Sequence, residues 1–196
     1  MIRYGLFVAA AVAVVALIAL MSWALSNRSP VTGLSGVTRV TKPAPDFTLD
    51  LMDGGQLLRS ELAGRPVVIN FWASWCTPCR DEAAGLERTW RDYEGRGVVF
   101  VGIDIQDSEL DARFYLEEFD VTYPNGRDED GKISVEYGVV GLPVTFFVSK
   151  EGVIERRWVG AIPESRLRDW TESLAQGLPL SDNDEEPDPD LFRQLR

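Results

Sequence analysis

The architecture follows from residues 67–80, Val67-Val68-Ile69-Asn70-Phe71-Trp72-Ala73-Ser74-Trp75-Cys76-Thr77-Pro78-Cys79-Arg80, in which an apolar run leads directly into a Cys-x-x-Cys motif. Runs rich in Val, Ile and aromatic residues are typical of buried strands. After the motif, apolar residues recur at helical spacing, at Ala83, Leu86, Trp90 and Tyr93. The two cysteines are therefore predicted to lie where a buried strand ends and a helix begins.

A strand-to-helix junction is a favourable place for a reactive thiol. The unpaired backbone N–H groups of the first helical turn and the helix dipole stabilise a thiolate, which lowers the pKa of a cysteine placed there. Pro78 fits in this turn, because a backbone N–H would have no helical partner there. The spacing puts the sulfur atoms of Cys76 and Cys79 on one side of the turn, close enough to bond to each other. We interpret the pair as a redox-active dithiol.

Other uses of the two cysteines fit the sequence less well. A zinc site needs about four ligands, and this chain has two Cys and no His. A purely structural disulfide at this spacing would close a loop too short to constrain the unfolded chain much. The absence of His also excludes Cys–His and Ser–His catalytic pairs.

The composition limits the functional classes further. A chain of 196 residues has room for one ordinary domain with appendages, and an apolar fraction of 45% supports a real core. The net charge of −11 argues against nucleic-acid binding, which needs a basic face. Six carboxylates lie within the last sixteen residues. Residues 179–196 are therefore predicted to be an acidic, disordered tail, with a binding role as the alternative.

An apolar segment opens the chain. Residues 5–25 carry no charged side chain, and as a helix they would span about 31 Å, enough to cross a hydrocarbon core. The apolar region of a cleaved secretory signal is typically only ~7–15 residues long. Residues 1–25 are therefore predicted to be a transmembrane signal-anchor, with a cleaved signal as the alternative. Arg3 favours a cytoplasmic N-terminus, although Arg28 weakens this bias. We expect a single-pass protein of the inner (cytoplasmic) membrane whose folded domain is periplasmic, or extracytoplasmic.

The rest of the chain predicts one α/β domain. Residues 26–42 lack periodicity and predict a flexible linker, and residues 43–178 form the predicted domain. Besides the central strand and its helix, the expected elements are a hairpin at 47–58, a helical turn at 60–64, strands at 97–104, 144–148 and 153–159, a helix from 108, a polar loop at 125–132, a helical turn at 133–137 and a final helix from 163. The helix positions expected to face the core are Leu110, Phe114 and Leu116 or Phe119, and then Leu167, Trp170, Leu174 and Leu178.

Two motifs together indicate a family. Phe71-Trp72-Ala73-Ser74-Trp75-Cys76-Thr77-Pro78-Cys79 is followed later by Gly141-Leu142-Pro143-Val144-Thr145-Phe146-Phe147. This combination resembles the membrane-tethered, thioredoxin-like thiol–disulfide oxidoreductases of the TlpA/ResA and DsbE (CcmG) type. The resemblance covers residues 43–178. It implies a thioredoxin-like fold, with a central mixed β-sheet flanked by helices and an N-terminal β-hairpin.

The resemblance also implies roles for individual residues. Cys76 would be the attacking, more exposed sulfur and Cys79 the resolving one. Leu142-Pro143 would be a cis peptide beside the dithiol whose backbone pairs with the substrate chain; from the residues alone, an ordinary trans proline is the alternative. Glu82 would exchange a proton with Cys79 during resolution. From its position alone, Glu82 could equally be an acid that complements the helix dipole.

The surface around the dithiol is expected to contact the substrate. Trp75 is adjacent to Cys76, and its amphipathic ring suits a surface that binds a polypeptide. The predicted substrate-binding residues are Trp75, Thr77, Pro78, Leu142 and Pro143.

Two positions depart from the family pattern. Asn70 stands where many thioredoxins have a buried Asp, six residues before the first cysteine. Since Asn cannot take a proton, acid–base help must come from Glu82 or water. Val144 stands where DsbE-type proteins often have Glu, which argues against a strict DsbE-type assignment to cytochrome maturation and leaves the general TlpA-like interpretation intact.

The predicted function is reduction of disulfides in exported proteins. The client would be an exported protein such as apocytochrome c, with its haem-binding Cys pair. A membrane protein would donate the electrons, because exported compartments are generally oxidising. No cofactor beyond the Cys76–Cys79 disulfide is expected, and no metal. The alternatives are an envelope disulfide oxidase or isomerase, a thiol peroxidase of the peroxiredoxin type, and a non-enzymatic envelope binding module with a structural Cys pair.

Overall fold

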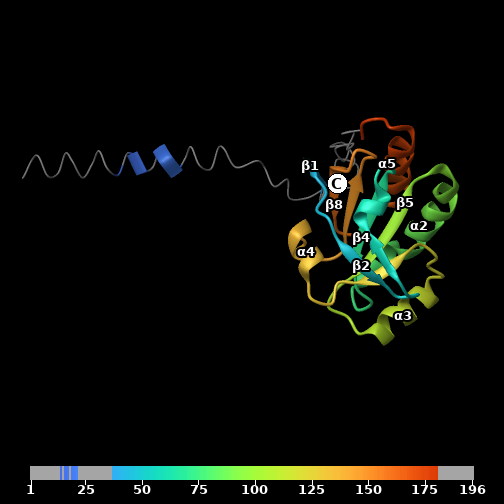
Figure 1. Ribbon diagram of the computed structural model, residues 1–196. Coiled ribbons are helices and arrows are strands. Elements are labelled where there is room, and N and C mark those ends of the chain that lie inside the picture. Colours follow the sequence, from blue (N-terminus) through green and yellow to red (C-terminus); the bar gives the residue numbers. More distant parts are fainter. Residues whose placement is uncertain (1–13, 15, 18, 22–36, 181–196) are drawn as a thin grey trace, which may run out of the picture. The chain divides into compact units, whose positions relative to one another are not determined.

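The computed structural model describes residues 14, 16–17, 19–21 and 37–180 (Figure 1). From residue 37 on, the described residues form an eight-stranded sheet with the order β1-β8-β7-β4-β5-β6-β2-β3. The strands are β1 (Val37–Pro43), β2 (Thr48–Leu51), β3 (Gln56–Leu58), β4 (Val67–Trp72), β5 (Val99–Asp104), β6 (Asn125–Arg127), β7 (Val144–Val148) and β8 (Val153–Val159). The α-helices are α2 (Thr77–Tyr93), α3 (Glu109–Glu118), α4 (Lys132–Tyr137) and α5 (Glu164–Gln176), and the 3-10 helices are η1 (Arg59–Leu62) and η2 (Glu94–Arg96).

The apolar run before the cysteines forms β4, in the middle of the sheet. All six of its residues are buried, as expected for a strand with paired neighbours and both faces covered. β4 pairs in parallel with β5 and antiparallel with β7, so the sheet is mixed, as predicted. Trp72 lies opposite Asp104 of β5, and Phe71 lies opposite Val144 of β7. The end of β4, the end of β5 and the start of β7 therefore meet at one edge of the sheet.

Alternate residues of β4 face different layers, as the pleat of a strand requires. Ile69 lies in the apolar cluster that α4 covers with Tyr137. Val68 lies in a second cluster, with the buried faces of α2 and α5. Trp72 lies in a third cluster, where the ring of Tyr115 from α3 stacks on it with a centroid distance of 4.2 Å. Helices thus cover both faces of the sheet.

One glycine in β5 makes room for a buried hydrogen bond. A Cβ atom on Gly102 would lie 1.7 Å from Asn125 Oδ1. This oxygen accepts a hydrogen bond of 2.9 Å from the indole N–H of Trp72. Because a buried N–H without a partner is destabilising, the missing side chain of Gly102 supports the packing of Trp72.

The predicted hairpin and most of the predicted elements are present. β2 and β3 pair antiparallel, and Gly54 and Gly55 turn the chain with φ values of +100° and +82°. The predicted turn at 60–64 contains most of η1, and Gly64 follows with φ of +81°. The remaining predicted strands and helices correspond to β5, β7, β8, α3, α4 and α5. The predicted core positions of α5 that are buried are Leu167, Trp170 and Leu174.

Two segments predicted to be irregular contain strands. Residues 37–42 of the predicted linker belong to β1, which pairs antiparallel with β8. The folded domain therefore begins before residue 43. Residues 125–127 of the predicted loop form β6, which lies between β5 and β2. Neither segment has a strong apolar alternation, so pairing with neighbouring strands, rather than local propensity, makes each one a strand.

The prediction for the core-facing side of α3 is wrong at Leu110 and Phe114. Leu110 and Phe114 are 63% and 58% exposed, whereas Ala112 and Tyr115 are buried. The stacking of Tyr115 on Trp72 sets the rotation of the helix, so a tertiary contact overrides the apolar spacing. The predicted positions of α3 that do pack against the core are Leu116 and Phe119.

The domain also ends later than predicted. Gly177 ends α5 with φ of +66°, and Leu178 lies outside the helix and is 52% exposed. Leu180, in the predicted tail, is 2% exposed and packs in the cluster with α2 and α5. Arg156 donates a hydrogen bond of 2.6 Å from Nη2 to the Leu180 carbonyl. The folded domain therefore reaches residue 180.

Most of the predicted anchor lies outside the described residues. Within residues 1–25, the described positions 14, 16–17 and 19–21 are helical. Across the described part of the chain, no helix has the length and apolar character needed to cross a membrane. Residues 26–36 of the linker and 181–196 of the tail also fall outside the described part.

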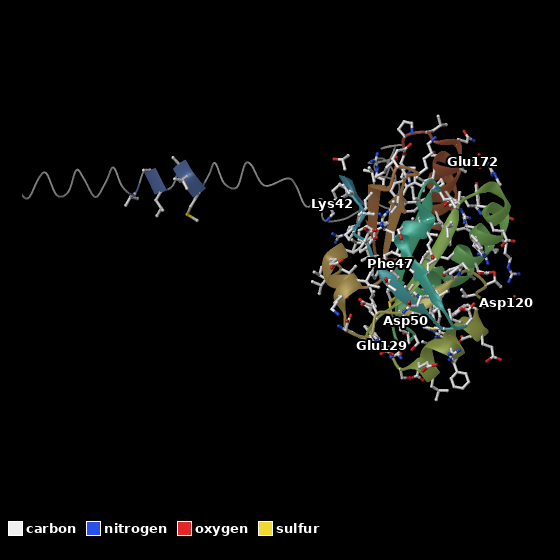
Figure 2. The ribbon with its side chains drawn as sticks, in the orientation of Figure 1. Lys42, Phe47, Asp50, Asp120, Glu129 and Glu172 are labelled. Carbon is white, nitrogen blue, oxygen red and sulfur yellow. A yellow bond between two sulfur atoms is a disulfide. The ribbon has the colours of Figure 1, made fainter. Side chains whose placement is uncertain are left out.

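Charged side chains line the outside of the helical layer, as Asp120 and Glu172 show in Figure 2. Asp120 pairs with Arg91 at 2.8 Å, and Glu172 pairs with Arg96 at 2.7 Å. Exposed pairs of this kind each contribute little to stability. The apolar clusters, rather than these pairs, hold the helices on the sheet.

Candidate active site

Cys76 and Cys79 form a disulfide at the start of α2. Their Cα atoms are 5.2 Å apart. Cys76 is the N-cap residue of the helix, and its Sγ accepts a hydrogen bond of 3.2 Å from the backbone N–H of Cys79. Pro78 lies in the first turn, as predicted. After reduction, this N–H group and the helix dipole would both stabilise a thiolate at Cys76.

The disulfide is enclosed, whereas the residues beside it are exposed. Cys76 is 4% exposed and Cys79 is 0% exposed. Trp75 is 60% exposed, and its indole N–H donates a hydrogen bond of 3.0 Å to the Gln106 carbonyl. The other exposed residues of the motif are Thr77 and Pro78. The exposed surface beside the disulfide thus includes Trp75, Thr77 and Pro78, and their part in substrate binding stays a prediction.

The peptide bond between Leu142 and Pro143 is cis, which is the geometry that the resemblance implies. Leu142 packs against the cluster that contains both cysteines, so this bond lies beside the disulfide. The Pro143 carbonyl accepts a hydrogen bond of 2.9 Å from the backbone N–H of Gly160. The part that Leu142 and Pro143 play in substrate binding stays a prediction.

Glu82 lies one turn after Cys79 on the buried face of α2 and is 5% exposed. Its Oε1 accepts a hydrogen bond of 2.8 Å from the Asn70 amide, and its Oε2 accepts one of 2.7 Å from the backbone N–H of Ile162. Burial raises the pKa of this carboxyl to about 7, against the lowering effect of the two hydrogen bonds. Because Glu82 is beyond the first turn of α2, it does not cap the helix. A carboxyl with this pKa can both hold and release a proton near neutral pH.

Asn70 orients this acid, a role that the sequence alone did not reveal. The Asn70 amide nitrogen donates one hydrogen bond to Glu82 and another, of 3.0 Å, to Thr145 Oγ1. It thereby links β4, α2 and β7 at the buried side of the site. The available signal was the alternation of β4, which puts Asn70 on the same face as Trp72.

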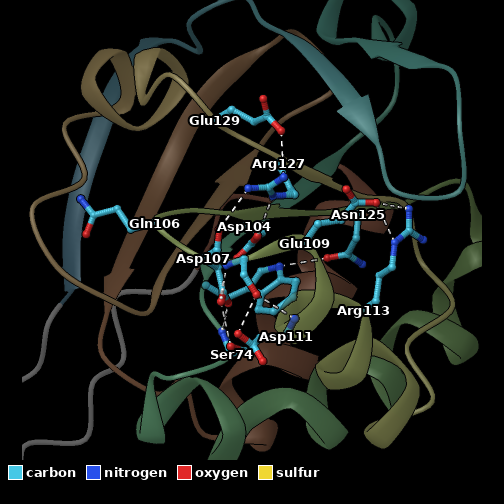
Figure 3. Close-up of polar contacts among 12 residues, drawn as sticks. Ser74, Asp104, Gln106, Asp107, Glu109, Asp111, Arg113, Asn125, Arg127 and Glu129 are labelled. Atoms are coloured by element: carbon cyan, nitrogen blue, oxygen red, sulfur yellow. Dashed lines mark hydrogen bonds and ion pairs between the residues drawn. The ribbon is translucent and has the colours of Figure 1, made fainter.

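Two other contacts that hold the motif were also missed. The Asp107 carboxylate accepts hydrogen bonds from the backbone N–H of Ser74 at 2.5 Å and from its hydroxyl at 3.0 Å (Figure 3). The Tyr115 hydroxyl donates a hydrogen bond of 3.0 Å to the Cys79 carbonyl. Both partners come from segments after β5, so only the fold brings them to the cysteines.

No clustered metal ligands accompany the disulfide in the described residues. Within that part of the chain, no group of three or more His, Cys, Asp or Glu side chains is placed to hold a metal ion. The chemical groups that the described residues bring together at this site are the two sulfur atoms, the Glu82 carboxyl and the groups that orient them.

A mixed sheet flanked by helices, with a Cys-x-x-Cys disulfide at a helix N-terminus, defines a thioredoxin-like thiol–disulfide oxidoreductase. The comparisons with known proteins agree with this class. The family model described as the AhpC/TSA family matches residues 40–157. The chain belongs to this family.

Curated relatives carry the same activity in their names. Thiol-disulfide oxidoreductase ResA of Oceanobacillus iheyensis is 32% identical over 143 residues, which cover 71% of this chain and 74% of the relative. Thiol:disulfide interchange protein DsbE of Pseudomonas fluorescens biotype C is 38% identical over 141 residues, which cover 71% of this chain and 77% of the relative. The predicted resemblance to ResA and DsbE proteins is confirmed, and so is the enzyme class.

Solved structures confirm the thioredoxin-like fold. A secreted disulfide oxidoreductase of Mycobacterium tuberculosis, described as homologous to E. coli DsbE, matches with a TM-score of 0.61 and 25% identity and covers 65% of this chain and 96% of that one. A thiol:disulfide interchange protein of the thioredoxin family from Chlorobium tepidum TLS matches with a TM-score of 0.64 and 24% identity, over 69% of this chain and 97% of that one.

Proposed function

We propose that this protein is a membrane-tethered reductase of disulfides in exported proteins. The observation that carries the proposal is the buried Glu82 carboxyl, one helical turn after Cys79 and with a pKa of about 7. A dithiol that reduces a client must release a proton from its second thiol, and this carboxyl has the pKa to receive it. A purely structural disulfide has no use for a buried acid at this position.

The first step is attack on the client. The Cys76 thiolate attacks one sulfur of the client disulfide, the client S–S bond breaks, and a mixed disulfide with Cys76 forms. The released client sulfur leaves as a thiolate and takes a proton from water. The position of Cys76 at the N-terminus of α2 supports the thiolate. We propose that Trp75 and the Leu142–Pro143 peptide hold the client chain.

The second step is resolution by Cys79. Glu82, as carboxylate, accepts the proton of the Cys79 thiol, and the resulting thiolate attacks the sulfur of Cys76. The mixed disulfide breaks, the second client thiolate leaves and takes a proton, and the Cys76–Cys79 disulfide forms. Two electrons have then moved from the dithiol to the client. The sequence of steps runs in reverse if the protein acts as an oxidase.

The setting of the reaction is also a proposal. The apolar residues 5–25 would anchor the chain in the cytoplasmic membrane, with the folded domain on the outer side. A membrane protein would return the disulfide to the dithiol with two electrons and two protons. The haem-binding Cys pair of apocytochrome c is the client class we favour, because such a pair must be reduced before haem attaches. The names ResA and DsbE of the relatives support an interchange activity in general.

A trapping experiment tests the mechanism. In cells that express the full chain with Cys79→Ala, Cys76 can attack a client but the mixed disulfide cannot resolve, so a covalent adduct should accumulate and disappear on reduction. The matched control is Cys76→Ala, which retains one thiol but should trap nothing. If Cys79→Ala yields no adduct with exported proteins, the reductase proposal fails.

Three further measurements test the direction of the reaction, the activity and the topology. The reduction potential of the Cys76–Cys79 pair decides between reductase and oxidase, because a reductase needs a low potential. Reduction of insulin with dithiothreitol as the electron source should exceed the background rate, whereas a binding module with a structural Cys pair would not exceed it. Labelling of Cys76 in intact cells by a thiol reagent that cannot cross membranes would support the proposed topology, and the absence of labelling would contradict it.

A further inference from the structure

A second buried carboxyl group lies at the edge of the sheet where the active-site loop, residues 73–76, begins. Asp104 ends β5 opposite Trp72 and is 1% exposed. Within the described residues, neither of its oxygens has a hydrogen-bond partner when the group is ionised, whereas in its neutral form Asp104 shares a hydrogen bond with the Asp107 carboxylate. Arg127 Nε lies 3.7 Å from Asp104 Oδ2. Because buried carboxyls are normally hydrogen-bonded, the position of Asp104 calls for an explanation other than packing.

A chain of contacts leads from Asp104 to the active-site loop (Figure 3). Arg127 donates from Nη2 to the Asp107 carbonyl at 3.0 Å. The Asp107 carboxylate in turn receives both the backbone N–H and the hydroxyl of Ser74. Ser74 is two residues before Cys76 in the sequence. A change in the charge of Asp104 can thus affect the active-site loop, which carries Cys76, by way of Arg127 and Asp107.

The segment after β5 holds the next residue of the loop as well. The indole N–H of Trp75 donates to the Gln106 carbonyl at 3.0 Å. Gln106 has φ of +54°, in the left-handed region that non-glycine residues rarely adopt. A strained residue of this kind persists where the surrounding contacts hold it. Residues 104–107 therefore fix both Ser74 and Trp75.

We propose, resting on the proposed function, that Asp104 is a positioning residue for Cys76 and acts through Arg127 and Asp107. In its neutral state, Asp104 leaves Arg127 to the Asp107 carbonyl and to Glu129, which pairs with Arg127 at 2.8 Å. In its ionised state, Asp104 attracts Arg127 and repels the Asp107 carboxylate. The repulsion weakens the hydrogen bonds from Ser74 to Asp107 and thereby changes the position of the Cys76 sulfur.

The charges around Asp104 place the change of state near neutral pH. Burial first, then the negative charge of Asp107 and a hydrogen bond to it, raise the pKa of Asp104 to about 8, while the charge of Arg127 opposes the rise. Glu129 and Glu109 also act on Arg127, from the segment after β6 and from α3. The negative charges of Glu129 and Glu109 partly neutralise Arg127, so that Arg127 stabilises ionised Asp104 less. The loop is therefore held more firmly below pH 8 than above it.

The titration of the loop tests this proposal without any use of activity. In the oxidised full chain in detergent micelles, labelled with ¹⁵N, we expect the Ser74 amide and Trp75 indole signals to shift with a midpoint near pH 8. Asp104→Asn should abolish this step. The matched control is Glu87→Gln, which removes another buried carboxyl, one that binds Thr122, and should keep the step.

Either of two results with the wild type and Asp104→Asn would overturn the proposal. One is a wild-type loop with no step near pH 8, and the other is a step that survives in Asp104→Asn. A second variant, Asp107→Asn, keeps Asp104 but removes the charge that raises its pKa, so its step should move to lower pH. An unchanged midpoint in Asp107→Asn would also count against the proposed coupling.

The reactivity of the reduced protein is the second readout. The rate of Cys76 alkylation by iodoacetamide should be similar in the wild type and Asp104→Asn below pH 7, and should differ by at least about twofold above pH 8.5, where ionised Asp104 alters the position and access of the Cys76 sulfur in the wild type alone. Equal rates at every pH would show that Asp104 does not affect Cys76. If the protein failed to reduce insulin, the proposed function would fall, while the loop titration would still be decided by the spectra.

Discussion

The Glu82 carboxyl meets two demands that oppose each other. Its burial raises its pKa to about 7, which suits an acid that exchanges protons near neutral pH. The same burial makes the ionised form unfavourable in the folded protein. The residue proposed to serve resolution therefore destabilises the fold at the pH where it acts.

The first prediction concerns the pH dependence of stability. The unfolded chain releases the Glu82 proton near pH ~4.3, whereas the folded protein holds it up to about pH 7. The folded state binds the extra proton, so stability falls as pH rises from about 5 to 8. Glu82→Gln should remove on the order of 2 kcal/mol of this decrease. Urea unfolding of the oxidised protein at pH 5 and pH 8 measures it.

Glu172→Gln is the control for this prediction. Hydrogen bonding to Arg96 lowers the pKa of Glu172 to about 2, so this carboxylate is ionised in both the folded and unfolded chain above pH ~5. Its removal should leave the difference between pH 5 and pH 8 unchanged. A Glu82→Gln variant that keeps the full wild-type decrease would show that Glu82 does not hold its proton in the folded protein.

Asn70 illustrates how far single residues can be predicted from the sequence. The motif identifies Cys76 and Cys79 because their chemistry depends on local spacing. The partners of Asn70 are 12 and 75 residues away in the chain, so its role depends on the packing of three elements. The sequence shows only that Asn70 cannot carry a proton. The structure adds that Asn70 orients Glu82, whose carboxyl can carry one.

Among the elements, those with strong local signals were predicted and those defined by their neighbours were not. β4, α2 and the β2–β3 hairpin follow from apolar runs, helical spacing and a Gly-Gly turn. β1 and β6 exist because adjacent strands supply their hydrogen bonds. The buried side of α3 is set by long-range contacts, among them the stacking of Tyr115 on Trp72 and the hydrogen bond from the Tyr115 hydroxyl to the Cys79 carbonyl. Long-range contacts of this kind leave no periodic pattern in the sequence.

The second prediction concerns β5. Gly102→Ala would place a methyl group against Asn125 Oδ1 and displace the acceptor of the Trp72 indole N–H. Overpacking and a lost buried hydrogen bond should together lower the free energy of unfolding by about 3 kcal/mol. Thermal or urea unfolding measures the loss.

Gly95→Ala is the matched control for β5, because a Cβ at Gly95 meets open space. This variant should stay within about 0.5 kcal/mol of the wild type. Equal stability of the Gly102 and Gly95 variants would mean that Asn125 can move away without loss, and that the indole N–H does not need it.

The extent of the whole domain was predicted only in part. The sequence places the folded region at 43–178, whereas the described domain runs from 37 to 180. Composition marks the interior of a domain well, but its ends depend on single contacts such as the packing of Leu180. The cis peptide at Pro143 was expected only through the family resemblance, because the residues themselves fit a trans bond equally well.

The third prediction concerns the C-terminal boundary. Leu180 is 2% exposed among the side chains of the cluster with α2 and α5. Leu180→Ala should therefore lower the free energy of unfolding by about 2–3 kcal/mol. Leu178→Ala, at a residue that is 52% exposed, should change it by less than about 0.5 kcal/mol. Similar values for the two variants would show that the domain ends before residue 180.

The pairing of β1 with β8 has a geometric consequence for a tethered enzyme. Residues 37–42 lie in the sheet, so they do not lengthen the linker that sets how far the catalytic domain can move from the membrane. Residues 26–42 fully extended could reach about 60 Å, but residues 26–36 alone could reach only about 40 Å. If residues 5–25 anchor the chain as proposed, the catalytic domain is confined to a thinner layer of space next to the bilayer than a linker of residues 26–42 would allow. Within that layer, the effective concentration of the catalytic domain near membrane-bound donors is higher. Clients must then come close to the bilayer to be reduced.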